Sequence, residues 1–280
     1  MARSTQQAGF ARRVNPTPAR TDEGPAVWTC LAIAAALAFL GSIAAAEAAS
    51  APGSPPILAT LWRWTPLIFS GFLFNLLVSV LSMLLGTAAG VLLGLAQISP
   101  HASVRRIAWA ITQFFRNAPW LVLLFYAMFL IPFEVTIFGI QVAIPAWIKA
   151  VIGLALPVMA NVSEVVRGGI VSIPAGQWES AEALAFSRRQ ILWLIILPQA
   201  IKRMIPPWMN LYAILTMATS TMSIVGVQEV VAMTKGALVA EGRLELFIPM
   251  YAMALLFFFA YCYPIARWTA ALERRFSVKG

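Results

Sequence analysis

The segment Gly176-Gln177-Trp178-Glu179-Ser180-Ala181-Glu182-Ala183-Leu184-Ala185-Phe186 is a polar, helix-forming stretch between two strongly apolar parts of the chain. It runs on to Ile195-Ile196-Leu197-Pro198-Gln199-Ala200, which makes it far longer than a tight connection between two membrane helices needs to be. Long ordered loops frequently carry function. The stretch therefore predicts a docking surface at one end of a helical bundle.

The composition around this loop is that of a membrane protein. Of the 280 residues, 60% are hydrophobic and 11% are charged, and the mean hydropathy is +0.81. These values are too apolar for a soluble domain, and a membrane-spanning helix needs about 20 mostly apolar residues. We therefore expect an all-α integral membrane protein. Six stretches are long and apolar enough to be spans: residues 27–46, 67–97, 118–135, 143–170, 206–232 and 246–268.

The charges sort by loop rather than forming a basic patch. The net charge of +9 could indicate nucleic-acid binding, but the basic residues gather before the first span, after the second, in the long loop and at the C-terminus. The positive-inside rule places these segments in the cytoplasm, together with the tails 1–26 and 271–280. The sequence thus predicts a multi-pass protein with a cytoplasmic C-terminus and no nucleic-acid partner. The basic residues concerned are Arg3, Arg12, Arg13, Arg20, Arg105, Arg106, Arg116, Arg188, Arg189, Lys202, Arg203, Arg267, Arg274, Arg275 and Lys279.

The first apolar segment, residues 27–48, has two interpretations. Arginines precede it and Ala46-Glu47-Ala48-Ala49 ends it, so it reads either as a retained extra span or as a secretory signal peptide with a small-residue cleavage site. Loop charge does not separate these alternatives, because the remaining loops keep the same sides in both. Farther along, Lys149 is expected to extend its side chain to the outer membrane surface.

The long loop has the signals of two short helices. Residues 175–184 are good helix formers, and Ser187 with Gln190 three positions later has the spacing of a capping box at the start of a second helix. Pro198 is expected to end or bend that second helix. On these features alone, the loop could equally be an amphipathic hairpin that anchors the chain to the membrane surface.

The residue pattern of the loop resembles the signature loop of importer permeases of the ATP-binding-cassette (ABC) superfamily. That pattern is Glu-Ala-Ala, three residues, Gly, nine residues, Ile-x-Leu-Pro, and here it reads Glu179-Ser180-Ala181, Ala185 and Ile195-Ile196-Leu197-Pro198. Ser180 replaces an alanine, and Ala185 replaces the glycine of the turn. Because glycine tolerates a positive φ that alanine disfavours, we expect a slightly different turn at Ala185.

Further motifs resemble the permeases for polar amino acids. They are Glu164-Val165-Val166-Arg167-Gly168-Gly169-Ile170, Gly176-Gln177-Trp178-Glu179, Leu197-Pro198-Gln199-Ala200, Pro206-Pro207, Ser223-Ile224-Val225-Gly226-Val227-Gln228-Glu229 and Arg116-Asn117-Ala118-Pro119. The resemblance covers residues 66–270, with the signature loop at 171–203. It implies a bundle of five core transmembrane helices with a cytoplasmic helix–turn–helix, and it leaves the first segment outside the permease domain.

The resemblance also implies partners and a coupling role for the loop. It implies two ABC ATPase subunits, a periplasmic substrate-binding protein and a second permease, identical or homologous, in the bacterial inner membrane. Glu179 is expected to make the main contact to the ATPase, with Trp178, Ala181 and Ala185 packing into its groove. The coupling residues are expected to be Gly176, Gln177, Trp178, Glu179, Ser180, Ala181, Ala185, Leu197 and Pro198.

A candidate substrate pathway follows from the span after the loop. The subfamily usually carries Lys-Asp-Thr-Ser-Leu there, whereas this chain has Met217-Ala218-Thr219-Ser220-Thr221. Two charges are lost, which indicates either a less charged or differently oriented substrate, or a structural partner of a second permease that keeps the substrate site. Glu164 and Arg167 have the spacing of a structural ion pair. The pathway candidates are Asn161, Thr216, Met217, Thr219 and Ser220.

The sequence also bears on catalysis. It contains no Gly-x-x-x-x-Gly-Lys-Ser/Thr loop and no cluster with metal-ligand spacing, so ATP and Mg²⁺ are expected on the partner ATPase and no cofactor on this chain. The expected function is that of a transport subunit, not an enzyme. The alternatives are a self-sufficient secondary transporter or channel, for which inverted repeats and paired midplane charges would be expected, and a structural partner subunit.

Overall fold

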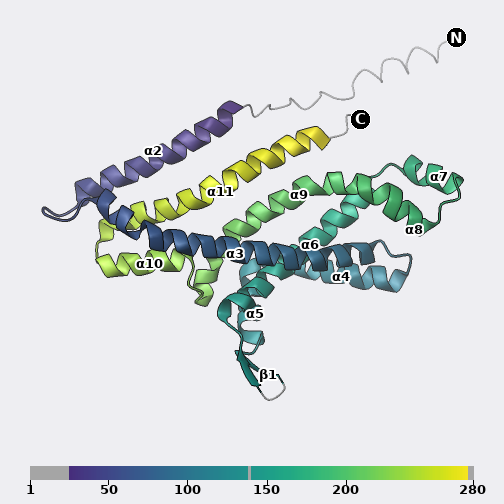
Figure 1. Cartoon of the computed structure of the whole chain (residues 1–280), viewed down its shortest axis with the longest axis horizontal. Helices are drawn as coiled ribbons and strands as arrows, with labels where there is room; N and C mark the ends of the chain where they lie inside the picture. Colours follow the sequence, from purple (N-terminus) through teal and green to yellow (C-terminus); the bar gives the residue numbers. More distant parts are fainter. Residues whose placement is uncertain (1–24, 138–139, 277–280) are drawn as a thin grey trace, which may run out of the picture.

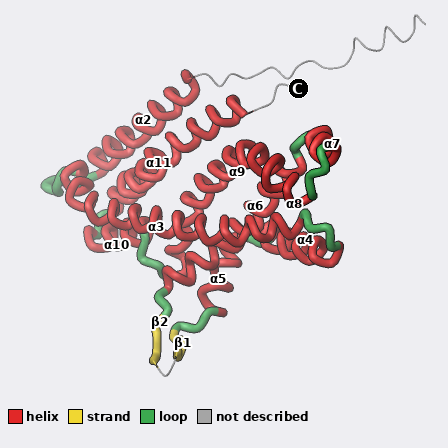
Figure 2. The backbone as a smooth tube through the Cα atoms, turned by 45° about the vertical axis from the view of Figure 1, so that its right-hand side comes forward, coloured by secondary structure: helices red, strands yellow, loops and turns green. Residues whose placement is uncertain are grey.

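The computed structural model describes residues 25–137 and 140–276, and nearly all of these are helical. Figure 1 shows the helices as a bundle, and Figure 2 shows the two strands confined to one projecting hairpin. The all-α membrane architecture is therefore confirmed, with one small β-hairpin added. The elements are α2 (Pro25–Ala49), α3 (Ile57–Gln97), α4 (Ala102–Asn117), α5 (Trp120–Leu130), β1 (Glu134–Ile137), β2 (Ile140–Ala143), α6 (Ala146–Val171), α7 (Ala175–Ala183), α8 (Arg188–Gln190), α9 (Leu197–Ala218), α10 (Val230–Glu241) and α11 (Phe247–Phe276).

Within the described ranges, 4 helices are long and apolar enough to cross a membrane, or 5 if a bent pair counts as one span. The 4 lie in α2, α3, α6 and α11, and the bent pair joins Arg188–Val225 to Val230–Glu241 at 51°. The expected third span, residues 118–135, is wrong. Its helix α5 has only 11 residues, or about 16 Å at 1.5 Å per residue, and the antiparallel hairpin β1–β2 follows it.

The expected fifth span, residues 206–232, is also not a single helix. α9 begins earlier, directly after a π-helical segment at Ile191–Ile196. Pro198 lies in the first turn of α9, so it neither ends the helical path nor separates α9 from the loop. A 3₁₀ segment at Thr219–Val225 then leads to Gly226, whose φ of 83° stops the helix. At the C-terminal end, α11 runs to Phe276 and so includes much of the expected tail 271–280. Most of the expected tail 1–26 lies outside the described residues.

The centre of the bundle is the contact of α3 with α6, which rests on three glycines spaced four residues apart. A Cβ at Gly90 would lie 2.7 Å from the carbonyl oxygen of Met159, and one at Gly94 would lie 2.8 Å from that of Ser163. A Cβ at Gly86 would meet the side chain of Val158. The backbones approach closely because these positions have no side chain, as the every-fourth-residue pattern predicts.

The segment before the permease body is peripheral. α2 lies beside α11 in both views (Figures 1 and 2). Of its most apolar stretch of 18 residues, only 6% is buried. The Glu47 carboxylate accepts a hydrogen bond from the backbone N–H of Ile57 at 2.9 Å, which ties the end of α2 to the start of α3.

The expectation for Lys149 is wrong. Its side chain is 0% exposed, and its Nζ lies 3.3 Å from the centre of the Phe133 ring and 3.5 Å from the carbonyl oxygen of Met128. The residues leading into the β1–β2 hairpin therefore cover the ammonium group, and the aromatic face and the carbonyl replace the water it would otherwise need.

Candidate coupling loop and translocation pathway

The loop after α6 folds back on the bundle as a short helix, α7. Its Ala181 side chain is only 2% exposed and belongs to the main hydrophobic core, and Trp178 packs against the same core. We expected Trp178 and Ala181 to pack into an ATPase groove, and this is wrong for Ala181, whose methyl group is buried in its own chain. The exposed side chains of the helix and its end are Ala175, Gln177, Glu179, Ser180, Glu182, Ala183 and Leu184.

The turn after α7 is a Schellman motif centred on Ala185. The N–H of Phe186 donates to the carbonyl of Ala181 at 3.2 Å, and the N–H of Ala185 donates to that of Glu182 at 2.9 Å. Ala185 has a φ of 58° and is the one described non-glycine residue with a positive φ. The expected change of turn is wrong, because alanine adopts the left-handed conformation that the motif requires.

The second arm of the loop consists of α8 and the π-helical segment Ile191–Ile196. It starts with the predicted capping box. The Ser187 N–H donates to Gln190 Oε1 at 2.9 Å, and the Gln190 N–H donates to Ser187 Oγ at 3.4 Å. Because this arm continues through the π-helical segment into α9, the loop and the following span form one connected structure.

Two polar contacts join α7 and the end of α6 to the start of α9. Gln199 Nε2 donates to Gln177 Oε1 at 3.3 Å, and Arg203 Nη1 donates to the carbonyl oxygen of Ser172 at 2.5 Å. Met204 fills the space where a side chain at Gly169 would lie. α7 is thus joined to the start of α9, and the end of α6 is joined to the same part of α9.

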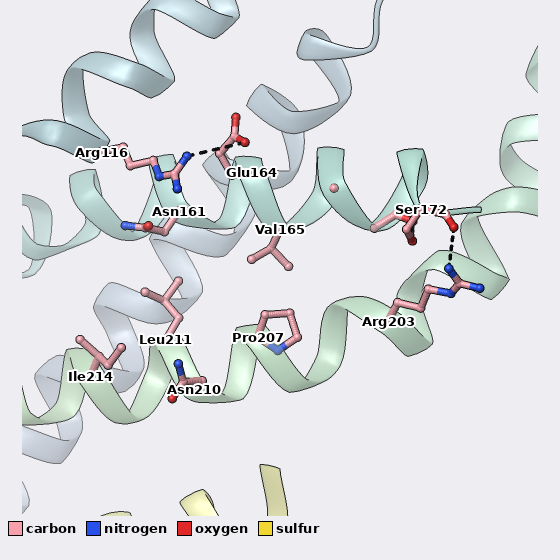
Figure 3. Close-up of a pocket in the computed structure, with 12 residues that line it drawn as sticks. Arg116, Asn161, Glu164, Val165, Ser172, Arg203, Pro207, Asn210, Leu211 and Ile214 are labelled. Carbon is pink, nitrogen blue, oxygen red and sulfur yellow. Dashed lines mark hydrogen bonds and ion pairs between the residues drawn. The ribbon is translucent and has the colours of Figure 1, made fainter. Parts of the chain in front are cut away.

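A pocket of about 570 Å³ lies between α6 and α9 (Figure 3). Asn161 and Val165 line it from α6, and Pro207 and Asn210 line it from α9. Its walls are mostly apolar with a few convergent polar groups, as is common for sites that bind small molecules.

Glu164 lines this pocket and forms ion pairs with two arginines. Its Oε2 lies 2.8 Å from Arg167 Nη2 and 3.8 Å from Arg116 Nη1, and Figure 3 shows Arg116 reaching it from the neighbouring helix α4. The pair expected between Glu164 and Arg167 is present, and Arg116 adds a second cation that spacing along one helix could not indicate.

The five pathway candidates separate into two groups. Thr216 and Thr219 are fully buried, and their hydroxyls donate to the carbonyls of Tyr212 and Thr216. Asn161 lies in the pocket, where its Nδ2 donates to the carbonyl of Pro157 at 2.8 Å. Met217 is 50% exposed and Ser220 is half-buried, so these two, with Asn161 in the pocket, are the candidates that keep some exposed surface.

A buried polar cluster fixes the break between α9 and α10. Glu229 is 0% exposed; its Oε1 accepts from the N–H groups of Val231 and Ala232 at 2.9 and 3.0 Å, and its Oε2 accepts from Asn75 Nδ2 at 3.0 Å. Asn75 also donates to Thr219 Oγ1 at 3.0 Å, and its Oδ1 accepts the N–H of Val230 at 3.1 Å. Both N–H donors and the oxygen of the Asn75 amide are thus bonded between α3 and the broken span.

Reasoning from sequence missed three features of this region: the 72% exposure of Leu184 at the tip of the loop, the position of Arg203 and Asn210 in the pocket, and the buried role of Glu229. The last had a signal, since the helix dipole favours an acidic side chain at the start of a helix. Among the described residues, no group of three His, Cys, Asp or Glu side chains could hold a metal ion. The absence of a cofactor on this chain stays a prediction.

Comparison with known proteins decides the family. Residues 86–278 match the family described as "Binding-protein-dependent transport system inner membrane component". This chain belongs to that family. The permease is therefore a transport subunit of an ABC importer and not an enzyme.

The relatives agree on this assignment. The permease is 32% identical over 212 residues to the "Probable amino-acid ABC transporter permease protein YckA" of Bacillus subtilis, covering 76% of this chain and 90% of the relative. It is 30% identical over 220 residues to the "Probable glutamine ABC transporter permease protein GlnP" of the same species, covering 78% and 94%. The fold also matches a chain of the "Crystal structure of an amino acid ABC transporter with histidines", with a TM-score of 0.67, 24% identity, and coverage of 79% of this chain and 99% of that one.

Proposed function

We propose that this permease forms part of the membrane pathway of an importer for polar amino acids or related compounds. A binding protein delivers the substrate from outside, a second permease completes the pathway, and two ATPase subunits with ATP and Mg²⁺ bind on the cytoplasmic side. The substrate class is supported by the names of the relatives and by the size and lining of the pocket between α6 and α9.

The observation that carries the mechanism is the connection of α7 to both pocket-forming helices. α7 exposes Glu179 and Leu184, while Ala181 anchors it in the core and Gln177 and Gln199 join it to α9. When the ATPase dimer closes, it displaces α7, and α6 and α9 then shift relative to one another. The pocket between them consequently changes its access from one side of the membrane to the other.

The permease is oriented with α7, α8 and α4 in the cytoplasm. These elements lie at one end of the molecule, opposite α10 and the turn between α2 and α3 (Figure 1). The first turns of α4 carry Arg105 and Arg106, and the start of the second arm carries Arg188 and Arg189, as expected of cytoplasmic segments. This orientation places the exposed face of α7 where an ATPase can reach it.

Charge reversal on α7 tests the coupling role. We expect Glu179→Lys to leave the protein inserted and its partners purifiable but to abolish substrate-stimulated ATP hydrolysis, because the contact face is acidic at Glu179 and Glu182. Glu273→Lys, an exposed charge reversal on α11, is the matched control and keeps the stimulation. The measurement is the ATPase rate of the reconstituted complex with and without substrate-loaded binding protein. Normal stimulation of Glu179→Lys would contradict the proposal.

The partners are tested by mass spectrometry of the C-terminally tagged chain, purified gently from its native membranes. Stoichiometric co-purification of an ATPase subunit is expected, and the same spectrum shows whether a second, different permease is present. Isolation of the chain alone in several mild detergents would instead favour a self-sufficient transporter.

A further inference from the structure

A second, larger groove lies beside α7 and is separate from the pocket between α6 and α9. Its volume is about 920 Å³, and it runs between the end of α3, the start of α4, the end of α6 and the second arm of the loop. Most of its wall is apolar, including Leu95, Val104, Ile170 and Leu192. The mechanism above assigns no role to this space.

The apolar surface continues from the groove onto the outside of the protein. Val104 is 43% exposed, Val171 65% and Trp193 50%, and all three line the groove. Leu194, next along the chain, is 64% exposed. A continuous apolar surface of this kind is unfavourable in water and fits contact with lipid chains. Tryptophan at such a position is typical of the membrane–water interface.

The polar part of the groove is cationic. Arg188 and Arg189 line it and are exposed, and neither takes part in any of the ion pairs found in the described part of the chain. A third arginine, Arg105, donates from Nη1 to the carbonyl oxygen of Ser99, another lining residue, at 3.0 Å. Among the residues that the structure describes, no acidic side chain lines the groove. Its occupant should therefore combine an apolar body with a negatively charged end.

We propose that this groove binds an anionic phospholipid, with an acyl chain along the apolar wall and the phosphate-bearing headgroup at Arg188 and Arg189. Arginine is well suited to bind phosphate oxygens through paired N–H donors, and basic pockets between helices on the cytoplasmic side are suited to anionic headgroups. The basic segment that precedes α2, with Arg3, Arg12, Arg13 and Arg20, is a poor occupant because it would bring like charge to the arginines.

The site is placed to influence coupling. Trp178, on the inward side of α7, lines the groove, whereas Glu179 faces outward. A bound lipid would thus support α7 from behind, on the side opposite the face proposed for the ATPase. Lipid binding in the groove does not depend on the amino-acid substrate.

Native mass spectrometry of the full chain with its co-purifying subunits tests the proposal. The probes are dioleoylphosphatidylglycerol and the zwitterionic dioleoylphosphatidylcholine, titrated in a mild detergent. We expect the first phosphatidylglycerol to bind at least about tenfold more tightly than phosphatidylcholine, and Arg188→Gln with Arg189→Gln to remove about that factor. The matched control is Arg274→Gln with Arg275→Gln, an adjacent exposed arginine pair on α11 that loses the same charge.

A second variant tests the acyl chain and covers the case in which the arginine variant does not fold. Ala96 lines the groove, so Ala96→Trp should weaken lipid binding by filling the space, whereas Ala240→Trp on exposed α10 should not. Equal binding of both lipids, an equal loss in both arginine pairs, or no effect of Ala96→Trp would each overturn the proposal. So would displacement of the lipid by inorganic phosphate alone, which would indicate an anion site, or protection of the groove by a co-purifying subunit, which would indicate a protein interface.

Discussion

At the scale of single residues, Ala185 shows how a motif can keep its geometry after losing its usual residue. The Schellman turn needs a left-handed residue directly after the helix, and Ala185 supplies it with a φ of 58°. For a residue with a Cβ this conformation costs about 1–2 kcal/mol. The two hydrogen bonds of the turn and the burial of Ala181 nevertheless keep α7 in place.

Ala185→Gly should therefore stabilise the permease. Relief of the left-handed strain exceeds the extra backbone entropy of glycine, so we expect a gain of about 0.5–1 kcal/mol in the free energy of unfolding. The melting temperature of the detergent-solubilised protein should rise by about 2 °C. Ala183→Gly, two residues earlier within α7, has the opposite expectation, a loss of up to about 1 kcal/mol. If both variants lower the melting temperature, Ala185 is not strained.

Residue-scale reasoning succeeded where the chemistry is local. The capping box of Ser187 and Gln190 depends on atoms three residues apart, so the sequence was sufficient to predict it. The same reasoning failed at Lys149, because its cover comes from Phe133 and Met128, 16 and 21 residues away. Composition alone could not indicate that these residues would lie over the ammonium group.

At the scale of elements, the α3–α6 contact depends on the absence of side chains at its glycines. Gly90→Ala would place a methyl carbon only 2.7 Å from the Met159 carbonyl oxygen. Because that neighbour is backbone, it cannot move aside cheaply, and we expect a loss of about 1–3 kcal/mol in the free energy of unfolding. The control is Gly236→Ala in α10, where nothing lies within 4 Å and the helix should become slightly more stable. Thermal unfolding of both variants in the same detergent gives the comparison, and equal melting temperatures would exclude close packing as the reason for the glycine.

The broken span gives a second prediction at this scale. In Glu229→Gln, an amide NH₂ replaces one of two oxygens that both accept hydrogen bonds, so it must face either Asn75 Nδ2 or the N–H groups of α10. Asn75 cannot turn over without losing the N–H of Val230. We expect a loss of about 1–3 kcal/mol, the usual cost of leaving a buried polar group unsatisfied. Glu182→Gln, an exposed substitution on α7, should leave the melting temperature unchanged. Equal stability of the two variants would show that the cluster is not what fixes the break.

The boundaries of the elements were the least predictable part of the fold. Hydropathy located the apolar segments, but it does not distinguish an 11-residue helix followed by a hairpin from a complete span, as at α5 and β1–β2. The break after α9 depends on Gly226 and on the buried carboxylate of Glu229, whose partner Asn75 lies 154 residues away. Motif spacing predicted the loop and the family, whereas these long-range pairings required the structure.

At the scale of the whole molecule, the proposed orientation rests on where the arginines lie along the bundle. The loop arginines belong to the end that carries α4, α7 and α8, and the turn between α2 and α3 lies at the other end with α10 (Figure 1). The ATPase, its nucleotide and the proposed anionic lipid all require the first end to be cytoplasmic. A reversed orientation would leave α7 on the side of the binding protein, where no ATP is available.

Cysteine accessibility in intact cells tests this orientation directly. In a background with Cys30 and Cys262 replaced by serine, Ala51→Cys and Leu244→Cys should react with a membrane-impermeant maleimide added from outside, because both positions are exposed at the end opposite α7. His101→Cys and Leu184→Cys, exposed at the α4 and α7 end, should react only after the inner membrane is permeabilised. Complete reaction of all four cysteines after denaturation is the control for expression and reactivity. The reverse pattern would place α7 outside the cell, and the coupling role of Glu179 and the phospholipid groove on the cytoplasmic side would both be lost with it.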